Sequence, residues 1–243
     1  MIPSFEVWAP VKGFEDRYEV RIFRDGELPI RTYDWHDLFN LLVWLAFPRA
    51  KAAINARHYR ALLGQQQSGT LNRGPAQDAL TLFDESGVVV LSGDADLLQD
   101  VRDFAWKQLF WRRRERVRRH FRCIILGHAL YEKALQPFVG ITGHAILFEA
   151  EQGSQPSMTI EGGTWETLDA RLAARVSDET AFLTPRELAP LPLVTNTDTT
   201  VSKERVGSSD QLTSIQRSLS RSYSRLPTLQ SCVWMTSPSP RPR

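Results

Sequence analysis

The segment Tyr33–Leu63, YDWHDLFNLLVWLAFPRAKAAINARHYRALL, is the longest apolar run in the chain, and the other elements must pack around it. A helix that is apolar on all sides belongs in a protein core. The run is also well short of the ~20 apolar residues that span a bilayer. Pro48 interrupts the run and suits the first turn of a new helix. We therefore expect two core helices, at Trp35–Ala46 and Pro48–Leu63, with Gly64 ending the second.

Polar residues within this segment fall on shared helix faces. His36 and Asn40 are four residues apart, as are Lys51 and Asn55, so each pair lies along one face. These side chains could line a site. In the alternative interpretation their roles are local: Asp37 helps to cap the helix, Asn40 bonds a neighbouring loop, and His36 is a buried, hydrogen-bonded histidine. Spacing alone favours the local roles.

The composition is that of an ordinary globular protein. The chain has 243 residues, 42% of them hydrophobic and 24% charged, which is enough for one sizeable core. The net charge of +2 indicates no particular partner. The two cysteines, Cys123 and Cys232, form neither a metal-binding pattern nor a disulfide framework. The N-terminus lacks the pattern of a signal peptide, so we expect a cytoplasmic protein that does not enter a membrane.

Alternating or β-rich segments predict a small sheet. Tyr18–Phe23 alternates and is followed by the turn signal Asp25-Gly26, so we interpret it as an edge strand. Asp78–Asp84 and Gly87–Ser92 flank Glu85-Ser86 in the pattern of a hairpin. Two further strands are expected, at Cys123–Leu126 and Ala145–Phe148.

The predicted fold class is α+β: a single domain in which a small, mainly antiparallel sheet is packed by helices, with the Trp35–Leu63 helices on one face. Residues 1–194 form this domain. Residues 195–243 are rich in Ser, Arg and Pro and predict a disordered C-terminal tail, because they cannot bury enough apolar surface to offset their ordering entropy. Further helices are expected at Ala95–Phe110 and at Trp165–Val176 with Thr164 as its cap, and irregular segments at Met1–Glu15, Gly64–Gln77, Gly153–Gly163 and Ser177–Leu193.

Two histidines lie where predicted strands meet a predicted helix. His128 follows a strand and Gly127, so it begins a helix near the positive end of the helix dipole, which disfavours the imidazolium form. Glu132 lies four residues further along the same face. His144 begins the next strand, and one short helix connects the two histidines. The connection could bring His128 and His144 together.

The first functional hypothesis is an enzyme. Two or three histidines with a carboxylate form a ligand set for zinc or another divalent metal, and without metal a histidine–carboxylate pair could act as a general base. The most specific version is a hydrolase acting on a phosphoester-like substrate. The candidate catalytic residues are His36, Asp37, Asn40, Lys51, His128 and Glu132, and the candidate metal ligands are His36, His128 and His144.

The second hypothesis is a binding module, and the third is a structural or interaction protein without catalysis. Trp111–Arg122, WRRRERVRRHFR, is the most basic stretch and could bind nucleic acid or an acidic partner. The alternative is a solvated helix end, where the helix dipole favours cations. The arginines concerned are Arg112, Arg113, Arg114, Arg116, Arg118, Arg119 and Arg122.

Four motifs resemble a bacterial family of uncharacterised proteins, domain of unknown function 3025 (DUF3025). They are DWHDLFNLLVWLAFPRAKAAIN (34–55), RGPAQDALTLFDESG (73–87), LGHALYEKAL (126–135) and FLTPRELAPLPL (182–193). The likeness covers roughly Tyr18 to Leu193, after which VTNTDTTVSKERVG departs from the pattern. The resemblance implies no established activity. It places His36, Asp37, Asn40, Trp44, Lys51, Asn55, Asp78, Asp84, Gly127, His128, Glu132 and Lys133 at motif positions.

Overall fold

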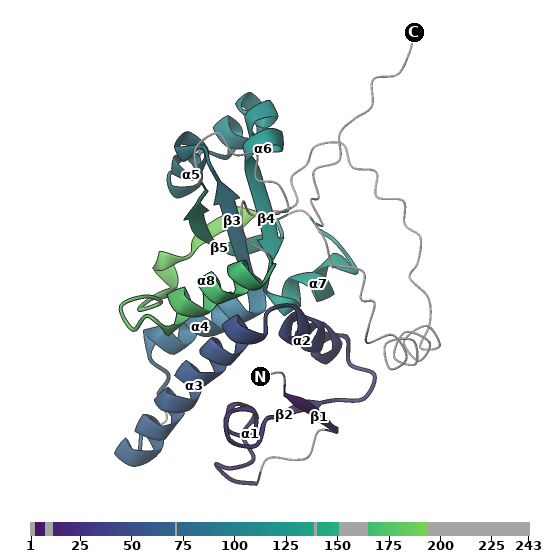
Figure 1. Ribbon diagram of the computed structural model, residues 1–243, viewed down its shortest axis with the longest axis vertical. Coiled ribbons are helices and arrows are strands. Elements are labelled where there is room, and N and C mark those ends of the chain that lie inside the picture. Colours follow the sequence, from purple (N-terminus) through teal and green to yellow (C-terminus); the bar gives the residue numbers. More distant parts are fainter. Residues whose placement is uncertain (1–2, 8–11, 71, 139, 151–164, 194–243) are drawn as a thin grey trace.

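The computed structural model describes residues 3–7, 12–70, 72–138, 140–150 and 165–193 (Figure 1). Within them, the strands are β1 (Ser4–Val7), β2 (Glu27–Ile30), β3 (Gly87–Ser92), β4 (Phe121–Ile125), β5 (Thr142–Glu149) and β6 (Ala189–Pro192). The α-helices are α1 (Tyr18–Asp25), α2 (Trp35–Ala46), α3 (Pro48–Ser68), α4 (Pro75–Ser86), α5 (Ala95–Arg102), α6 (Arg114–His120), α7 (His128–Ala134) and α8 (Trp165–Ser177). A π-helical turn, η1, covers Gln108–Arg112, and a 3-10 turn, η2, covers Pro185–Glu187.

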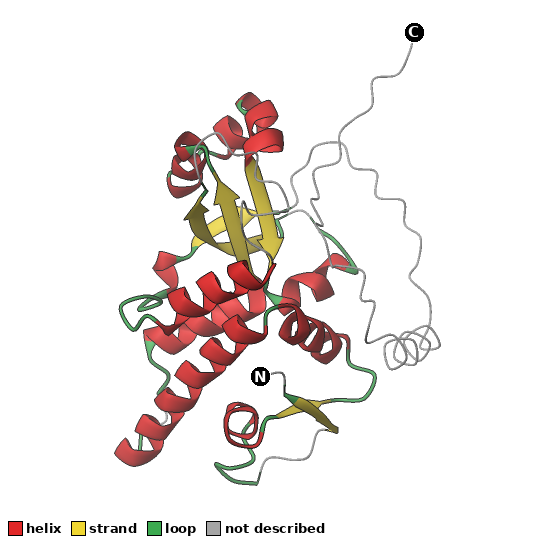
Figure 2. Ribbon diagram, viewed as in Figure 1, coloured by secondary structure: helices red, strands yellow, loops and turns green. Residues whose placement is uncertain are grey.

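The central sheet has the strand order β4-β3-β5-β6. β3 is antiparallel to β4 and parallel to β5, and β5 is antiparallel to β6. β1 and β2 form a separate parallel pair. The predicted α+β class, with a small and mainly antiparallel sheet packed by helices, is therefore confirmed (Figure 2). The tail predicted at residues 195–243 lies outside the described residues.

The sheet is apolar on both faces, because successive side chains of a strand point to opposite sides. Val89 and Ile146 face a core formed with α2, α3, α4 and α8. Val88 and Val90 face a second core formed with α5, η1 and α6. All three valines of β3 are completely buried, which is the environment expected for a central strand between two helical layers. In Figure 1, α3, α4 and α8 lie together below the strands.

The two core helices form at the predicted start positions. The side chain of Asp34 accepts the backbone N–H of Asp37 and caps α2, and Pro48 opens α3. The predicted end of α3 was wrong. The helix passes through Gly64 to Ser68 and ends at Gly69, whose φ of 67° provides the left-handed cap. The loop expected at Gly64–Gln77 is therefore shorter than predicted, because α3 continues to Ser68 and α4 begins at Pro75.

Two predicted strands are helices. Tyr18–Phe23 belongs to α1, and Gly26 is its C-cap with φ 68° rather than a hairpin turn. Asp78–Asp84 belongs to α4, so the hairpin prediction was wrong, although Gly87–Ser92 is β3 as expected. α4 begins with Pro75 at its first position.

The remaining differences are local. The helix predicted at Ala95–Phe110 ends at Arg102, because Phe104 adopts a left-handed φ of 55°, and the chain resumes in η1. The segments expected to be irregular contain β1 near the N-terminus and β6 near the end of the domain. Gly153–Gly163 and Thr164 lie outside the described residues. None of the described helices has the length and apolar character needed to cross a membrane.

Candidate metal-binding site

The junction between α4 and β3 organises the candidate site. α4 ends at Ser86 and β3 begins at Gly87 without a connecting loop. Leu126 and Gly127 both donate backbone N–H groups to the Gly87 carbonyl, at 3.0 and 2.8 Å. A Cβ atom on Gly127 would lie 2.4 Å from the Gly87 nitrogen, so only glycine permits this approach. The start of α7 is thereby held against the end of α4.

His128, the first residue of α7, is fixed as a neutral imidazole. Its Nδ1 lies 2.8 Å from the Asp84 carbonyl oxygen. A carbonyl only accepts, so Nδ1 carries the proton and donates it. Burial lowers the pKa of His128 to about 4. Its other ring nitrogen, Nε2, therefore presents a lone pair.

His36 of α2 faces this lone pair. Its Nε2 lies 2.9 Å from Nε2 of His128, and the two rings meet edge to face. The Nδ1 of His36 lies 2.9 Å from the Glu132 carboxylate, which accepts its proton. A neutral His36 would then place two lone pairs 2.9 Å apart. The arrangement consequently requires a positive species between the two Nε2 atoms, either a proton or a metal ion.

Glu85, the penultimate residue of α4, completes a three-ligand group. Its carboxylate oxygens lie 3.8 Å from Nε2 of His36 and 3.6 Å from Nε2 of His128. One ligand atom from each of these residues falls within 4.8 Å of the others. Ligand atoms around a tetrahedral zinc ion are separated by about 3.4 Å, given bonds of about 2.0–2.1 Å. The two imidazole nitrogens, at 2.9 Å, are closer than this spacing, and the Glu85 oxygens are slightly farther, so the three side chains converge on one region.

A buried ion pair between Lys51 and Asp84 lies next to this group. Lys51 is only 3% exposed and donates to the Asp84 carboxylate at 2.5 Å. Burial opposes ionisation of Asp84, but the Lys51 ammonium holds the pKa of that carboxyl below its ordinary value. The Lys51 nitrogen also lies 5.6 Å above the Trp44 ring. Lys51 is therefore occupied within the fold.

Four other residues at predicted site or motif positions have local roles. Asp37 pairs with Arg31 at 2.8 Å and helps to begin α2. Asn40 donates to the Tyr18 hydroxyl at 2.6 Å, and its own oxygen is buried without a partner among the described residues. Asn55 donates to a backbone carbonyl of α1 at 3.1 Å. Asp78 lies at the surface, 3.6 Å from Arg73.

His144 does not belong to the three-ligand group. Its Nδ1 lies 2.8 Å from the Ser86 hydroxyl, on the neighbouring turn of α4. The predicted connection between strand, helix and strand does bring His144 to the same end of the sheet as His128, since His144 pairs with Gly87 in the sheet register. The third member of the group is Glu85 rather than His144.

Comparison with known proteins assigns the chain to a family. A family model described as "Protein of unknown function (DUF3025)" matches residues 9–208. The chain belongs to the DUF3025 family. No curated protein and no solved structure matches it. The matched family is the one that the four sequence motifs resemble. It is a family of unknown function, so it gives no activity from which a substrate can be inferred.

Several arginines of the basic stretch of this DUF3025 chain pair with acidic residues of the same chain. Arg116 binds Asp94 through two nitrogens, at 2.8 and 2.7 Å. Arg113 lies 3.3 Å from Asp100. Further pairs join Arg114 and Arg118 to Glu115, and Arg122 donates to backbone carbonyls. These contacts favour the interpretation that the arginines tie α6 to α5 and β4.

Sequence reasoning missed one member of the group, Glu85, and it missed Tyr18, the buried partner of Asn40. Glu85 was placed in a hairpin turn, where its side chain would have pointed to solvent. Tyr18 was placed in an edge strand, whereas its hydroxyl is buried against Asn40. A signal for Glu85 was present: Gly74-Pro75 with Gln77 three residues after the cap is a helix start, and Gln77 accepts the Gly74 N–H at 3.2 Å.

Proposed function

We propose that this DUF3025 protein is a metal-dependent hydrolase in which His36, Glu85 and His128 hold a divalent ion. The observation that supports this most strongly is the orientation of the two histidines. Each donates its Nδ1 proton, His36 to Glu132 and His128 to the Asp84 carbonyl, and each turns Nε2 toward the same point. Metal-bound histidines are held in this way by acceptors behind them.

The donor set fits zinc or a similar first-row ion. Imidazole nitrogens and one carboxylate suit these metals, and two histidines with a glutamate form a recurrent catalytic zinc site. Three protein ligands leave one position for water or substrate, and a bound ion of this kind lowers the pKa of its water to about 7. In this proposal Glu132 and the Asp84 carbonyl orient the ligands, and Lys51 keeps Asp84 ionised and in place.

Phosphoesters are the first substrate class to test. Lys51 cannot bind a substrate phosphate because Asp84 occupies it. Lys133 is the better candidate, because its positive charge acts on both Glu85 and His144. Burial raises the pKa of Glu85, and Lys133 opposes this rise. Burial lowers the pKa of His144, and Lys133 adds to this lowering.

The decisive experiment measures metal binding before activity. The chelator-treated protein is titrated with Zn²⁺, Mn²⁺ and Mg²⁺ while metal content and thermal unfolding are recorded. At 100 times the dissociation constant, binding to the folded state stabilises by about 2.7 kcal/mol. Stoichiometric uptake with this stabilisation is expected for the natural chain, and hydrolysis of p-nitrophenyl phosphate and bis-p-nitrophenyl phosphate is then assayed in the loaded protein.

His144→Asn is the matched control for His128→Asn, because both histidines lie at the same end of the sheet. His36→Asn, Glu85→Gln and His128→Asn should each abolish stoichiometric binding, whereas His144→Asn should retain it. Equal binding by all four variants, or none by the natural chain, would overturn the proposal. If the natural chain binds no metal, a proton is shared between the Nε2 atoms of His36 and His128, and the two histidines form an acid–base pair without metal.

A further inference from the structure

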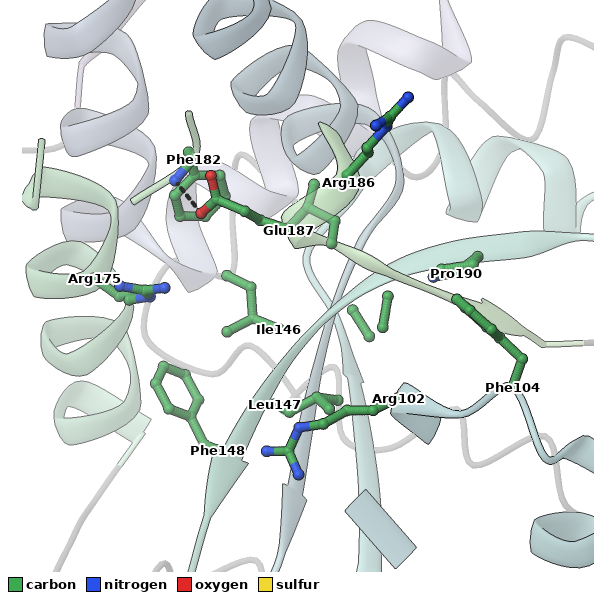
Figure 3. A pocket seen from close by; sticks show the side chains of 13 residues that line it. Arg102, Phe104, Ile146, Leu147, Phe148, Arg175, Phe182, Arg186, Glu187 and Pro190 are labelled. Carbon is green, nitrogen blue, oxygen red and sulfur yellow. Dashed lines mark hydrogen bonds between the residues drawn. The ribbon is translucent and has the colours of Figure 1, made fainter. Parts of the chain in front are cut away.

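A cleft of about 440 Å³ lies at the other end of β5. β6 pairs with Thr142–Ala145 only, and beyond Ala189 its chain turns into η2. The two segments therefore separate, and Figure 3 shows the cleft between them, with Ile146 and Leu147 on its floor. A volume of this size is within the range of ligand-binding clefts.

The floor of this cleft is the edge of a strand. Leu193 donates its N–H to the carbonyl of Ile141, so the backbone of Ile141 faces β6. Backbone groups of a strand alternate between its two edges. Ala145 and Leu147 therefore face the same edge, and Leu147 lies beyond the last pair, Ala145 with Ala189. Among the described strands none pairs with Leu147 on this side, so its N–H and C=O point into the cleft.

Arginines stand on both sides of this edge. Arg102 ends α5, on the face that Leu147 shares with Val90, and Arg175 lies on α8, on the opposite face. Figure 3 shows both side chains reaching toward the end of β5. Among the described residues, no carboxylate lies within ion-pair distance of Arg102. Arg175 has an exposed partner, Asp178, at 3.5 Å, and such surface pairs are weak.

The walls are held in uncommon backbone conformations. Phe104 and Phe182 both line the cleft and have φ of 55° and 57°. Bulky residues rarely adopt a left-handed φ, and such conformations concentrate where a ligand is bound. The Glu187 carboxylate is held in place on one wall, because its oxygens accept the N–H groups of Phe182 and Leu183 at 2.9 and 2.7 Å.

We propose that this cleft binds an acidic peptide segment of a partner protein, which adds to β5 as an antiparallel strand. One residue of the peptide lies opposite Leu147 and exchanges both backbone hydrogen bonds with it. Residues directly opposite each other share a face of the sheet. An acidic side chain at this central position therefore meets Arg102, and an acidic side chain at either neighbouring position meets Arg175. Backbone bonds provide affinity, and the two arginines select acidic sequences.

The test uses short fluorescent valine-rich peptides that carry a single Glu either at the central or at a neighbouring position. Binding to the full chain is measured by anisotropy with chelator present, so the result is independent of the metal site. Arg102→Gln should weaken the central-Glu peptide about tenfold and spare the other, and Arg175→Gln should do the reverse, as expected for loss of a charged hydrogen bond. Arg119→Gln, which removes an exposed charge of α6, should change neither.

N-methylated peptides separate strand addition from simple anion binding. Methylation of the amides that face β5 should abolish binding, whereas methylation of the outward-facing amides should leave it unchanged. If both methylated peptides bind equally well, or if a free anion such as inorganic phosphate displaces the peptide completely, the cleft is an anion site and strand addition is wrong. Absence of binding by every peptide would also overturn the proposal.

Discussion

The two ends of β5 hold their polar groups in opposite ways. At its beginning, near the Gly87 junction, His36 is fixed by a bond to Glu132 and His128 by a bond to the α4 backbone. At its other end, Arg102 and Arg175 are exposed and reach over a backbone edge that no described strand covers. A rigid group of converging ligands suits a small ion, whereas an open edge suits an extended chain. In our two proposals, one strand therefore serves two sites that differ in how far they are preorganised.

The largest expected difference concerns charge removal at the two ends. Lys51→Met leaves the largely buried Asp84 carboxylate without its partner and should lower the free energy of unfolding by about 3–5 kcal/mol. Arg102→Gln removes an exposed charge and should change it by no more than about 0.5 kcal/mol. Urea unfolding of both variants measures the two changes in the free energy of unfolding. A double variant, Lys51→Met with Asp84→Asn, should recover part of the loss, and a small effect of Lys51→Met alone would contradict the contrast.

A smaller effect is expected from backbone packing at the histidine end. Gly127→Ala places a methyl group 2.4 Å from backbone atoms of Ser86 and Gly87, so the start of α7 must shift. The expected loss is about 1–3 kcal/mol. Gly64→Ala is the control, because nothing lies within 4 Å of its added Cβ inside α3, and it should gain about 0.5–1 kcal/mol. Thermal unfolding separates the two, and equal effects would show that the junction is not tight.

The smallest effect is a pH dependence that only the histidine end should show. Burial lowers the pKa of His58, which lies on α3 near Asp84 and Lys51. In the unfolded chain His58 takes up a proton near pH 6.5, whereas in the folded chain it does so only at lower pH. This contribution to stability is complete above the unfolded pKa and decreases as the pH falls below about 6.5.

His58→Gln should therefore flatten the loss of unfolding free energy over this pH range. Arg102→Gln should leave the slope unchanged, because arginine remains charged throughout. Urea unfolding at several pH values provides the measurement. A slope that does not change in His58→Gln would mean that His58 is accessible to protons in the folded state.

The sequence predicted the elements that carry their own local signals. The apolar run and Pro48 identify α2 and α3, and strand, glycine and helix place His128 at the start of α7, as found. The shared face of His36 and Asn40 is also present, but only His36 reaches His128. Which of two polar residues meets a distant partner depends on the crossing of α2 and α7, and no local pattern encodes that crossing.

The sequence misled where a helix and a strand share one pattern. The alternation in Tyr18–Phe23 is compatible with either, and the buried residues Val20 and Ile22 also fit a short amphipathic helix ended by Gly26. The alternation in Asp78–Asp84 concealed α4 in the same way. Since Glu85 points toward the histidines only when α4 is helical, the error in secondary structure removed a ligand from the predicted site.

The loop-free passage from α4 into β3 has a consequence for how the length of this chain can vary. Adding one residue before Gly87 would rotate Glu85 by about 100° about the helix axis and carry the Asp84 carbonyl away from His128. Insertions between Pro75 and Leu91 should therefore be excluded from relatives that retain the site. The connection between the end of α3 at Ser68 and the start of α4 at Pro75 can lengthen without moving any of these atoms, so differences in length are expected there.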